Sequence, residues 1–389
     1  MTLSHKIILG DCVAGMQTLP DGCVQTCITS PPYWGLRDYQ GGTEEIGQEE
    51  TVEGYVEKMV EVFREIKRIL RDDGTVWLNL GDSYAHNVKE HNTKSDKQSS
   101  NRGTKEFLTP HRNFEGVGIK TKDLIGIPWR VAFALQADGW YLRQDIIWHK
   151  PNPMPESVTD RCTKAHEYIF LLSKSPHYYF DNVAIKEKAA QPRRDNFKFG
   201  GKKYTEFNDK NPDQKLKNYG STFVYTGTRN KRSVWTVNTK GYKGAHFAVY
   251  PEKLIEPCIL AGTSEHGCCS KCGAPYTRIL EVGKTPNRTP RVKNLNMIPG
   301  RDKPSRLNSA EMESIPKKTV GWGASCECED ASIVPCVVFD PFTGSGTTAV
   351  VSLKNGRNYI GTELNPDYVK ITEARIKEEI PQTLKGVFE

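Results

Sequence analysis

A serine followed by two prolines and a tyrosine, Ser30-Pro31-Pro32-Tyr33, is the first group of residues with an evident chemical capacity. The Ser30 hydroxyl and the Pro31 backbone carbonyl can accept hydrogen bonds, and Pro32 stiffens the loop that carries them. Acceptors fixed in this way can accept hydrogen bonds from both N–H groups of an amine whose lone pair is delocalised into a ring. Tyr33 offers a ring face on which an extruded base could stack. The commoner role of such a segment is a rigid turn with a packed aromatic ring.

A second candidate site is a glycine-containing run near the C-terminus, residues 339–348. Gly344 and Gly346 would let the backbone approach a ligand closely, at the start of a helix whose first N–H groups lack partners. Glu363 ends the next expected strand, where a carboxylate can bind two ribose hydroxyls. No lysine follows the second glycine, as a phosphate loop would require, so a cofactor with a ribose but no phosphate fits better. The alternative is an ordinary strand-to-helix turn.

Both loops need strands that end at one edge of a sheet. Residues 23–29 have the composition of a strand, which must stop at the two prolines because proline cannot continue a central strand. Residues 52–70 carry apolar side chains at spacings of three and four, which predicts an amphipathic helix, and 75–80 predict a buried strand after it. That order makes a parallel crossover unit. The other expected elements are a helix over 123–138, strands over 140–148 and 166–173, a helix over 251–260, strands over 334–339 and 358–362, and a helix over 366–379.

Together the two loops resemble those of the DNA amino-methyltransferases, which modify cytosine N4 or adenine N6. Residues 28–33 match the family's catalytic motif, residues 339–348 its S-adenosylmethionine motif, and Glu363 its ribose-binding acid. The catalytic motif comes first in the chain, as in the circularly permuted β class. The resemblance implies an α/β fold, a Rossmann-like methyltransferase mixed sheet that is circularly permuted, with a basic target-recognition insertion. It also implies base flipping on double-stranded DNA and, often, a homodimer. A small zinc-ribbon-like insertion is expected from the cysteines between positions 268 and 328.

The resemblance assigns residues to the catalytic loop and to the cofactor pocket. The catalytic residues would be Ser30, Pro31, Pro32 and Tyr33. An early Gly-Asp, here Gly10-Asp11, would contribute to the adenine pocket, and residues 246–254 would close over the methionine part. The full set of cofactor-binding residues implied is Asp11, Asp340, Phe342, Gly344, Gly346, Thr347 and Glu363.

The residue at position 30 bears on which base is methylated. Most adenine-specific relatives carry aspartate where Ser30 stands, and Thr-Ser-Pro-Pro-Tyr is the form usual in cytosine-N4 enzymes. The sequence therefore favours cytosine N4, with adenine N6 as the alternative. Methylation of RNA or of a protein amide is a further alternative, against which the basic insertion argues. A DNA-binding regulator without catalysis is another, against which the intact loops argue. The family resemblance also suggests a restriction-modification setting.

Five of the eleven cysteines fall between positions 268 and 328. Cys269-x-x-Cys272, followed by Gly273, resembles half of a zinc knuckle, and Cys326-x-Cys328 would supply the second pair of ligands. Four thiolates suit a closed, tetrahedral, structural Zn²⁺ site. Cys268 could replace Cys269, and in a reducing compartment disulfides are the weaker alternative.

The formal net charge of +7 is unevenly distributed. Residues 186–232 hold 13 Lys or Arg against 5 Asp or Glu, and 281–320 hold 9 against 4. Basic segments on an otherwise acidic chain suggest a polyanionic partner, and the aromatic residues between the cations could pack the element or wedge DNA. We expect Arg193, Arg194, Lys202 and Lys203 to bind phosphate. The alternative is a solvated loop without structure of its own.

These features divide the chain into parts. Residues 1–180 would form the catalytic half of the methyltransferase domain, and 236–263 with 331–389 the cofactor-binding half. Residues 181–235 would be the target-recognition insertion and 264–330 the zinc-binding insertion. No apolar run approaches the ~20 residues of a membrane span, and the N-terminus lacks a signal-peptide core. We therefore expect a cytoplasmic protein without membrane contact.

Overall fold

The computed structural model describes residues 3–35, 45–85, 118–188, 228–239, 249–282 and 317–380. The chain divides into two compact units. The larger unit lies within residues 1–185, 232–277 and 324–389, and the smaller one within 186–231 and 278–323. No helix in the described ranges has both the length and the apolar character needed to cross a bilayer.

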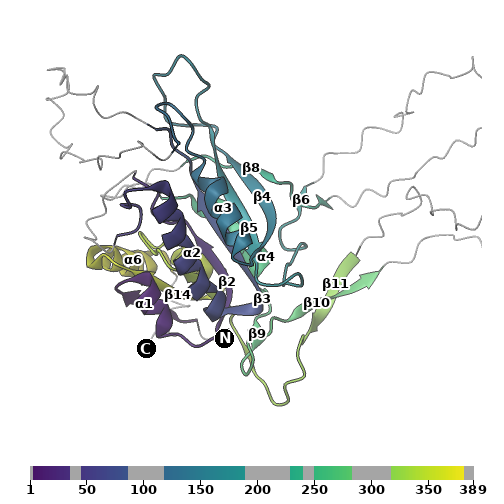
Figure 1. Cartoon of the computed structure of the whole chain (residues 1–389). Helices are drawn as coiled ribbons and strands as arrows, with labels where there is room; N and C mark the ends of the chain where they lie inside the picture. Colours follow the sequence, from purple (N-terminus) through teal and green to yellow (C-terminus); the bar gives the residue numbers. More distant parts are fainter. Residues whose placement is uncertain are drawn as a thin grey trace, which may run out of the picture. The chain divides into compact units, whose positions relative to one another are not determined.

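The larger unit is built on a mixed sheet, which over the described residues has eight strands in the order β1-β14-β13-β2-β3-β5-β4-β8 (Figure 1). The neighbours from β1 through to β3 pair in parallel, as do β4 and β8, whereas β5 is antiparallel to both β3 and β4. The central neighbours β2 and β13 come from opposite ends of the chain, as a permuted order requires. The strands are β1 His5–Leu9, β2 Val24–Thr29, β3 Leu70–Leu80, β4 Tyr141–His149, β5 His166–Ser173, β8 Val234–Thr236, β13 Val337–Asp340 and β14 Asn358–Glu363.

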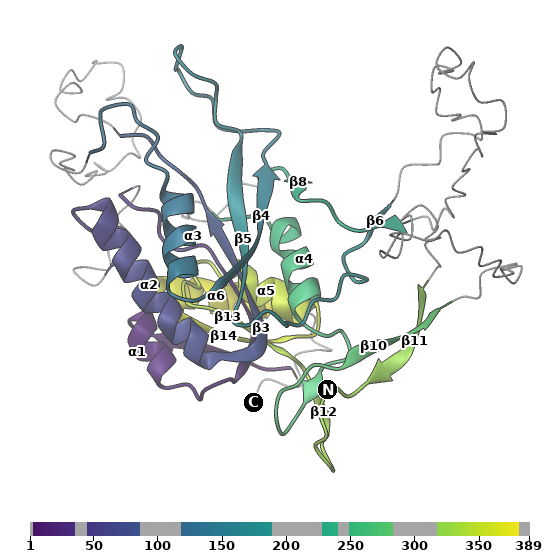
Figure 2. The same ribbon diagram turned by 45° about the vertical axis from the view of Figure 1, so that its right-hand side comes forward.

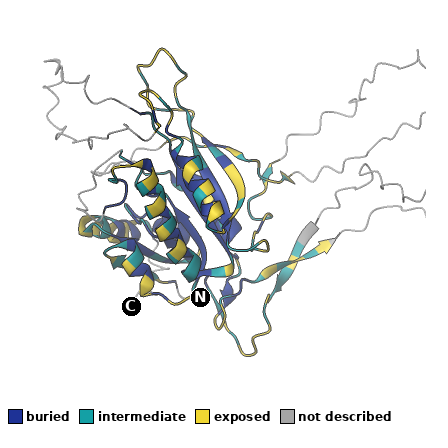
Figure 3. Ribbon diagram, viewed as in Figure 1, coloured by how far each residue is buried: buried dark blue, intermediate teal, exposed yellow. Residues whose placement is uncertain are grey.

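Helices cover both faces of this sheet (Figure 2). Apolar residues of α1 (Cys12–Gln17), α2 (Val52–Ile69) and α3 (Ile127–Ala137) pack on one face with side chains such as Cys27 and Phe170. Residues of α4 (Glu252–Gly262) and α5 (Thr347–Lys354) pack on the other, with Ile28 and Leu171, and α6 (Pro366–Glu379) packs beside α5. Successive strand residues thus face opposite layers. The central strands, such as β2 and β3, are largely buried, whereas much of β4 and the outward faces of α2 and α3 are exposed (Figure 3).

Several predicted elements are confirmed, among them the crossover over 24–80. The Thr51 side chain accepts from the Gly54 N–H at 3.1 Å and caps α2, which begins where predicted and ends one residue earlier, at Ile69. β3 begins directly at Leu70, five residues earlier than expected. The strand predicted over 334–339 was wrong as one element. Pro335 separates β13 from β12 (Ile333–Val334), which pairs with β9 (Cys268–Cys269) instead. β1 and α1 were not predicted, because five and six residues give little periodicity.

The smaller unit contains two strand pairs in its described part. β6 (Glu187–Lys188) is antiparallel to β7 (Thr228–Arg229), and the Arg229 guanidinium binds Glu187 at 2.8 Å. β10 (Thr277–Val282) pairs with β11 (Lys317–Gly323). Arg278 lies over the Trp322 ring, 4.4 Å from its centre. The boundary expected at residue 235 falls inside β8, which belongs to the larger unit, and its Trp235 lies in the same buried core cluster as Trp77.

Candidate active site

The carboxyl ends of five neighbouring parallel strands meet at one edge of the sheet. Glu363 at the end of β14 pairs with Leu9 at the end of β1, and Asp340 ends β13 beside them. Thr29 ends β2, opposite Leu78 of β3. Loops that follow such strand ends form the usual ligand crevice of an open α/β sheet. The two loops singled out in the sequence therefore lie at this common edge.

The Ser-Pro-Pro-Tyr loop follows directly on β2, all six residues of which are buried. The loop is held from outside by α2, because the Tyr55 hydroxyl donates to the Pro32 carbonyl at 3.0 Å. Beyond the tyrosine, the buried Trp34 donates through Nε1 to the Glu49 carbonyl at 2.8 Å. Prolines in sequence and hydrogen bonds on either side thus fix the backbone on which Ser30 sits.

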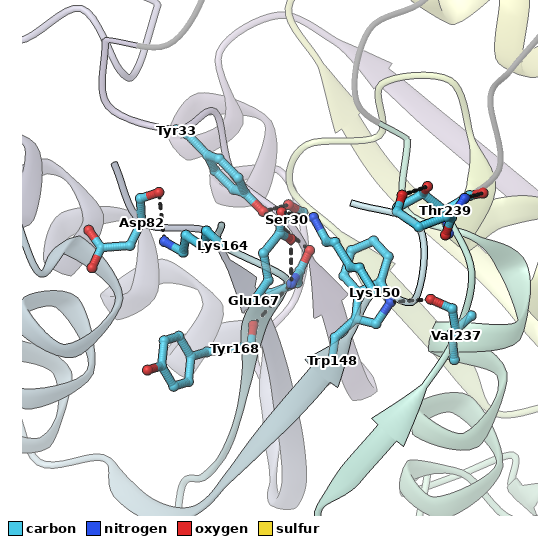
Figure 4. A network of polar contacts seen from close by, with 12 residues as sticks. Ser30, Tyr33, Asp82, Trp148, Lys150, Lys164, Glu167, Tyr168, Val237 and Thr239 are labelled. Atoms are coloured by element: carbon cyan, nitrogen blue, oxygen red, sulfur yellow. Dashed lines mark hydrogen bonds and ion pairs between the residues drawn. The ribbon is translucent and has the colours of Figure 1, made fainter. Parts of the chain in front are cut away.

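Tyr33 turns its hydroxyl toward polar residues of the sheet (Figure 4). The hydroxyl lies 3.0 Å from Glu167 Oε2 and 3.3 Å from Asn79 Oδ1, and the Ser30 hydroxyl donates to it at 3.5 Å. Burial, with the negative charge of Glu167 beside it, raises the pKa of Tyr33 well above its usual value. The tyrosine therefore stays protonated at neutral pH. Besides offering a ring, it is part of a hydrogen-bond network.

The partners of Tyr33 were not anticipated from the sequence. Glu167 lies near the start of β5, and its second oxygen Oε1 accepts from Lys150. The Lys150 ammonium lies 4.3 Å from the centre of the Trp148 ring. Asn79, on β3, is buried and donates to the Tyr168 carbonyl at 3.0 Å. The available signal was a glutamate and an asparagine within otherwise apolar strands, because buried polar side chains need partners.

Asp340 forms a second buried polar centre, only 1% exposed. Its oxygens accept from the hydroxyls of Thr29 at 2.7 Å, Thr348 at 2.7 Å and Tyr250 at 3.2 Å, and from the Phe342 N–H at 3.0 Å. Burial outweighs these donors and raises the pKa of Asp340 to about 7. Asp340 thereby holds together β2, β13, the start of α5 and the segment before α4.

The glycine loop turns sharply between β13 and α5. Gly344 and Gly346 have φ of 53° and 77°, in the left-handed region that favours glycine. A Cβ on Gly346 would lie 2.4 Å from the Thr372 methyl group. Glu363 braces the loop, since its Oε2 accepts from the Gly344 N–H at 2.7 Å and its Oε1 from the Asn365 N–H at 2.9 Å. Burial raises the pKa of Glu363.

The other expected cofactor residues also lie at this edge. Asp11 follows β1 and caps α1, its Oδ1 accepting from the Ala14 N–H at 2.9 Å. Phe342 is part-buried against the core, and Thr347 begins α5, where its hydroxyl lies 3.2 Å from the Arg375 guanidinium. The Tyr250 hydroxyl contacts Thr348 as well as Asp340. The structure therefore gathers the expected residues at one edge of the sheet, although several of their side chains brace the loops.

Four cysteine sulfurs form a separate cluster in the same unit. The Sγ atoms of Cys269, Cys272, Cys326 and Cys328 all lie within 4.8 Å of one another. Backbone N–H groups of Cys272 and Lys271 lower the pKa of Cys269 to about 6. Gly273, with φ of 70°, follows the first pair and closes its turn, since its N–H donates to the Cys269 carbonyl at 2.8 Å. This donor set fits a tetrahedral Zn²⁺, whose Zn–S bonds of about 2.3 Å separate the sulfurs by roughly 3.8 Å. Cys268, the alternative ligand, turns its thiol to the Pro335 carbonyl instead.

Comparison with known proteins decides the family. The family model described as DNA methylase matches residues 24–269 and 331–374, which include both loops. The chain belongs to this family of DNA amino-methyltransferases. The methyltransferase is 36% identical to the Type II methyltransferase M.SmaI of Serratia marcescens over 96% of this chain and 91% of that protein. It is 37% identical to M.Cfr9I of Citrobacter freundii over 95% of this chain and 87% of the relative.

A solved structure shares the fold of this methyltransferase. The cytosine-N4-specific PvuII DNA methyltransferase superposes with a TM-score of 0.51 at 14% identity, and the match covers 99% of this chain and 93% of the PvuII enzyme. The expected permuted, Rossmann-like mixed sheet is thereby confirmed. The four expected phosphate-binding residues, Arg193, Arg194, Lys202 and Lys203, lie outside the described residues of the methyltransferase.

Proposed function

We propose that this DNA methyltransferase transfers a methyl group from S-adenosylmethionine to the N4 amino group of cytosine in double-stranded DNA. The observation that carries the proposal is the position of Ser30. It stands at the end of β2 directly after Thr29, which hydrogen-bonds Asp340 at the head of the glycine loop. An acceptor for an amine and a loop suited to a nucleoside-like cofactor are thus held side by side.

Several residues would hold the cofactor. Glu363 and Asp11 lie at adjacent strand ends, suited to a ribose and an adenine. At Gly344 only the Phe342 carbonyl oxygen lies within 4 Å of where a Cβ would stand, so the backbone there would be open to the rest of the molecule. Phe342, Asp340 and Thr347 complete the expected set. When bound, S-adenosylmethionine supplies an electrophilic methyl group on a positively charged sulfur.

Ser30 and Pro31 would act on the amine that attacks this methyl group. Their oxygens accept the two N–H groups, which localises the nitrogen lone pair and points it away from the ring. The nitrogen would gain the methyl group as the bond between that methyl carbon and the cofactor sulfur breaks. The extra proton then leaves the acidic ammonium for water, so no strong base is required. Tyr33 and Pro32 would hold the loop rigid, and the Tyr33 ring would stack against a flipped base.

The serine favours cytosine over adenine. A neutral hydroxyl stands where most adenine-specific relatives carry aspartate, and adenine N6 is the second candidate. The test is methyl transfer from tritiated S-adenosylmethionine to unmethylated DNA of mixed sequence, followed by nucleoside separation. Label in N4-methyldeoxycytidine is expected. Label in N6-methyldeoxyadenosine alone would overturn the base assignment, and transfer to RNA or protein but not DNA would overturn the substrate class.

Three further assignments accompany this function. The four-cysteine cluster would hold a structural Zn²⁺. The basic segment 186–232 would bind DNA phosphates through Arg193, Arg194, Lys202 and Lys203. The names of the Type II relatives suggest a restriction-modification setting, and the homodimer that the family resemblance implies is checked by light scattering of the purified protein.

A further inference from the structure

The hydrogen-bond network beneath the catalytic loop fixes which of its groups donate hydrogen bonds and which accept them. Glu167 presents one oxygen to Tyr33 and the other to Lys150, and its side chain is only 15% exposed. An ionised carboxylate can only accept hydrogen bonds, whereas a protonated lysine can only donate them. The ion pair with Lys150 therefore keeps Glu167 an acceptor toward Tyr33 (Figure 4).

The Tyr33 hydroxyl has one hydrogen and two nearby acceptors on the sheet. Glu167 Oε2 is the nearer at 3.0 Å and carries charge, and Asn79 Oδ1 lies at 3.3 Å. Either acceptor draws this hydrogen toward the sheet and away from Ser30. The Tyr33 oxygen then has only lone pairs for Ser30, whose hydroxyl donates to it at 3.5 Å.

We propose that Glu167 is a positioning residue that acts through Tyr33. It directs the hydroxyl hydrogen of Ser30 toward Tyr33, so that the Ser30 lone pairs face the target amine. The proposal rests on the function proposed above. Serine is otherwise ambiguous, because a hydroxyl both donates and accepts, and a Ser30 hydrogen turned toward the amine would oppose its N–H groups. The chain Ser30 to Tyr33 to Glu167 removes that ambiguity without placing a charge on the loop. Such bonds commonly tighten when substrate binds.

Glu167→Gln tests the direction of the chain. The amide oxygen of the new side chain faces the Lys150 ammonium, so its NH₂ group faces Tyr33. Tyr33 then accepts from the amide and no longer donates to a carboxylate. Its hydrogen can turn to Ser30 as well as to Asn79 Oδ1, so the direction of the chain is no longer fixed. We expect kcat for methyl transfer to fall by about 10- to 100-fold, with KM for DNA and the affinity for S-adenosylhomocysteine unchanged.

Adding Lys150→Met to Glu167→Gln separates hydrogen direction from charge and from folding. Without the ammonium, the amide oxygen of the substituted side chain can turn back to Tyr33 and accept from Asn79 Nδ2, which in the wild-type protein lies 3.3 Å from Glu167 Oε2. The double variant should therefore turn over faster than Glu167→Gln alone. The double variant also leaves no unpaired charge, so its kcat can be measured even if the Glu167→Gln protein does not fold. In that case a kcat within about tenfold of wild type is expected.

Tyr33→Phe removes the middle hydroxyl and keeps the ring. It should lower kcat, and adding Glu167→Gln to it should cause no further loss. The matched control is Glu65→Gln, since Glu65 is 22% exposed and ion-paired with Arg68 on α2, and it should keep the wild-type kcat. Thermal denaturation of each variant checks folding.

Independent, multiplying losses from Tyr33→Phe and Glu167→Gln would overturn the proposal. So would a wild-type kcat in Glu167→Gln, or a double variant no faster than Glu167→Gln. The wild-type protein distinguishes this failure from failure of the proposed function. If it transfers methyl groups to DNA while the variants depart from these expectations, only the role of Glu167 is wrong; if it modifies no DNA base, the proposed function is wrong.

Discussion

The Thr29 hydroxyl donates to Asp340 Oδ1 at 2.7 Å, although the two residues are 311 positions apart in the chain. Thr29 ends β2 and precedes Ser30, and Asp340 ends β13 and precedes the glycine loop. Both side chains are buried. This bond joins the two strands whose loops are proposed to hold the amine and the cofactor. The relative position of the two loops therefore depends on a polar contact between distant parts of the sequence.

The protonation of Asp340 should make stability depend on pH. Burial raises the pKa of its folded form to about 7, against about 3.9 for an unfolded aspartate. The folded state then binds a proton more tightly, so the stabilisation from Asp340 is present below pH 4 and is lost as pH rises to about 7. The unfolding free energy of wild type minus that of Asp340→Asn should fall over this interval, by up to about 4 kcal/mol.

Urea unfolding of both proteins between pH 4 and pH 7.5 measures this difference. Asp72→Asn is the control, since Lys174 lowers the pKa of the exposed Asp72 and the small effect should have the opposite sign. A difference for Asp340 that increases with pH would mean that its four hydrogen-bond donors outweigh burial, which contradicts the prediction.

Alanine substitutions at Gly346, in the glycine loop, and at Gly356, after α5, should have unequal effects on stability. Gly346→Ala should destabilise the protein by about 3 kcal/mol, because the new Cβ meets Thr372 and the backbone has a φ of 77°. Gly356→Ala has almost the same backbone, with φ of 75° and no atom within 4 Å, and should cost about 1 kcal/mol. Urea unfolding and binding of S-adenosylhomocysteine measure both. Equal losses would show that contact with Thr372 is unimportant.

The cysteine cluster predicts one zinc per chain. Elemental analysis of the purified protein should find it, and Cys272→Ser should lose it and lower the melting temperature, because structural zinc contributes directly to folding. Cys162→Ser is the control, since Cys162 is also exposed and lies outside the cluster. A wild-type protein without zinc, or a Cys272→Ser protein that retains it, would contradict this assignment.

Sequence patterns located the two loops and most of the sheet, because both depend on local order. The prolines at positions 31 and 32 end a strand whatever its place in the sheet. The spacing of apolar residues in α2 likewise predicts a helix without knowledge of its neighbours. The pairing of Cys269–Cys272 with Cys326–Cys328 was likewise foreseeable from ligand type.

The polar networks could not be predicted in the same way. Glu167 and Tyr33 are 134 positions apart, and only the antiparallel pairing of β5 with β3 brings Glu167 beneath the loop. The capping of α1 by Asp11 required knowledge of that short helix. The contact between Glu167 and Tyr33 depends on how distant segments pair in the folded protein, which the spacing of residues along the chain does not reveal.

Ser30→Ala gives the most direct test of the central claim, that the Ser30 hydroxyl accepts from the amine in a loop beside the cofactor site. Single-turnover methyl transfer to DNA should be compared with wild type, alongside titration with S-adenosylhomocysteine. The predicted result is a rate at least ~100-fold lower with unchanged affinity for S-adenosylhomocysteine, because the substitution removes an acceptor and leaves Thr29 and Asp340 in place. A Ser30→Ala protein with the full wild-type rate would contradict the account.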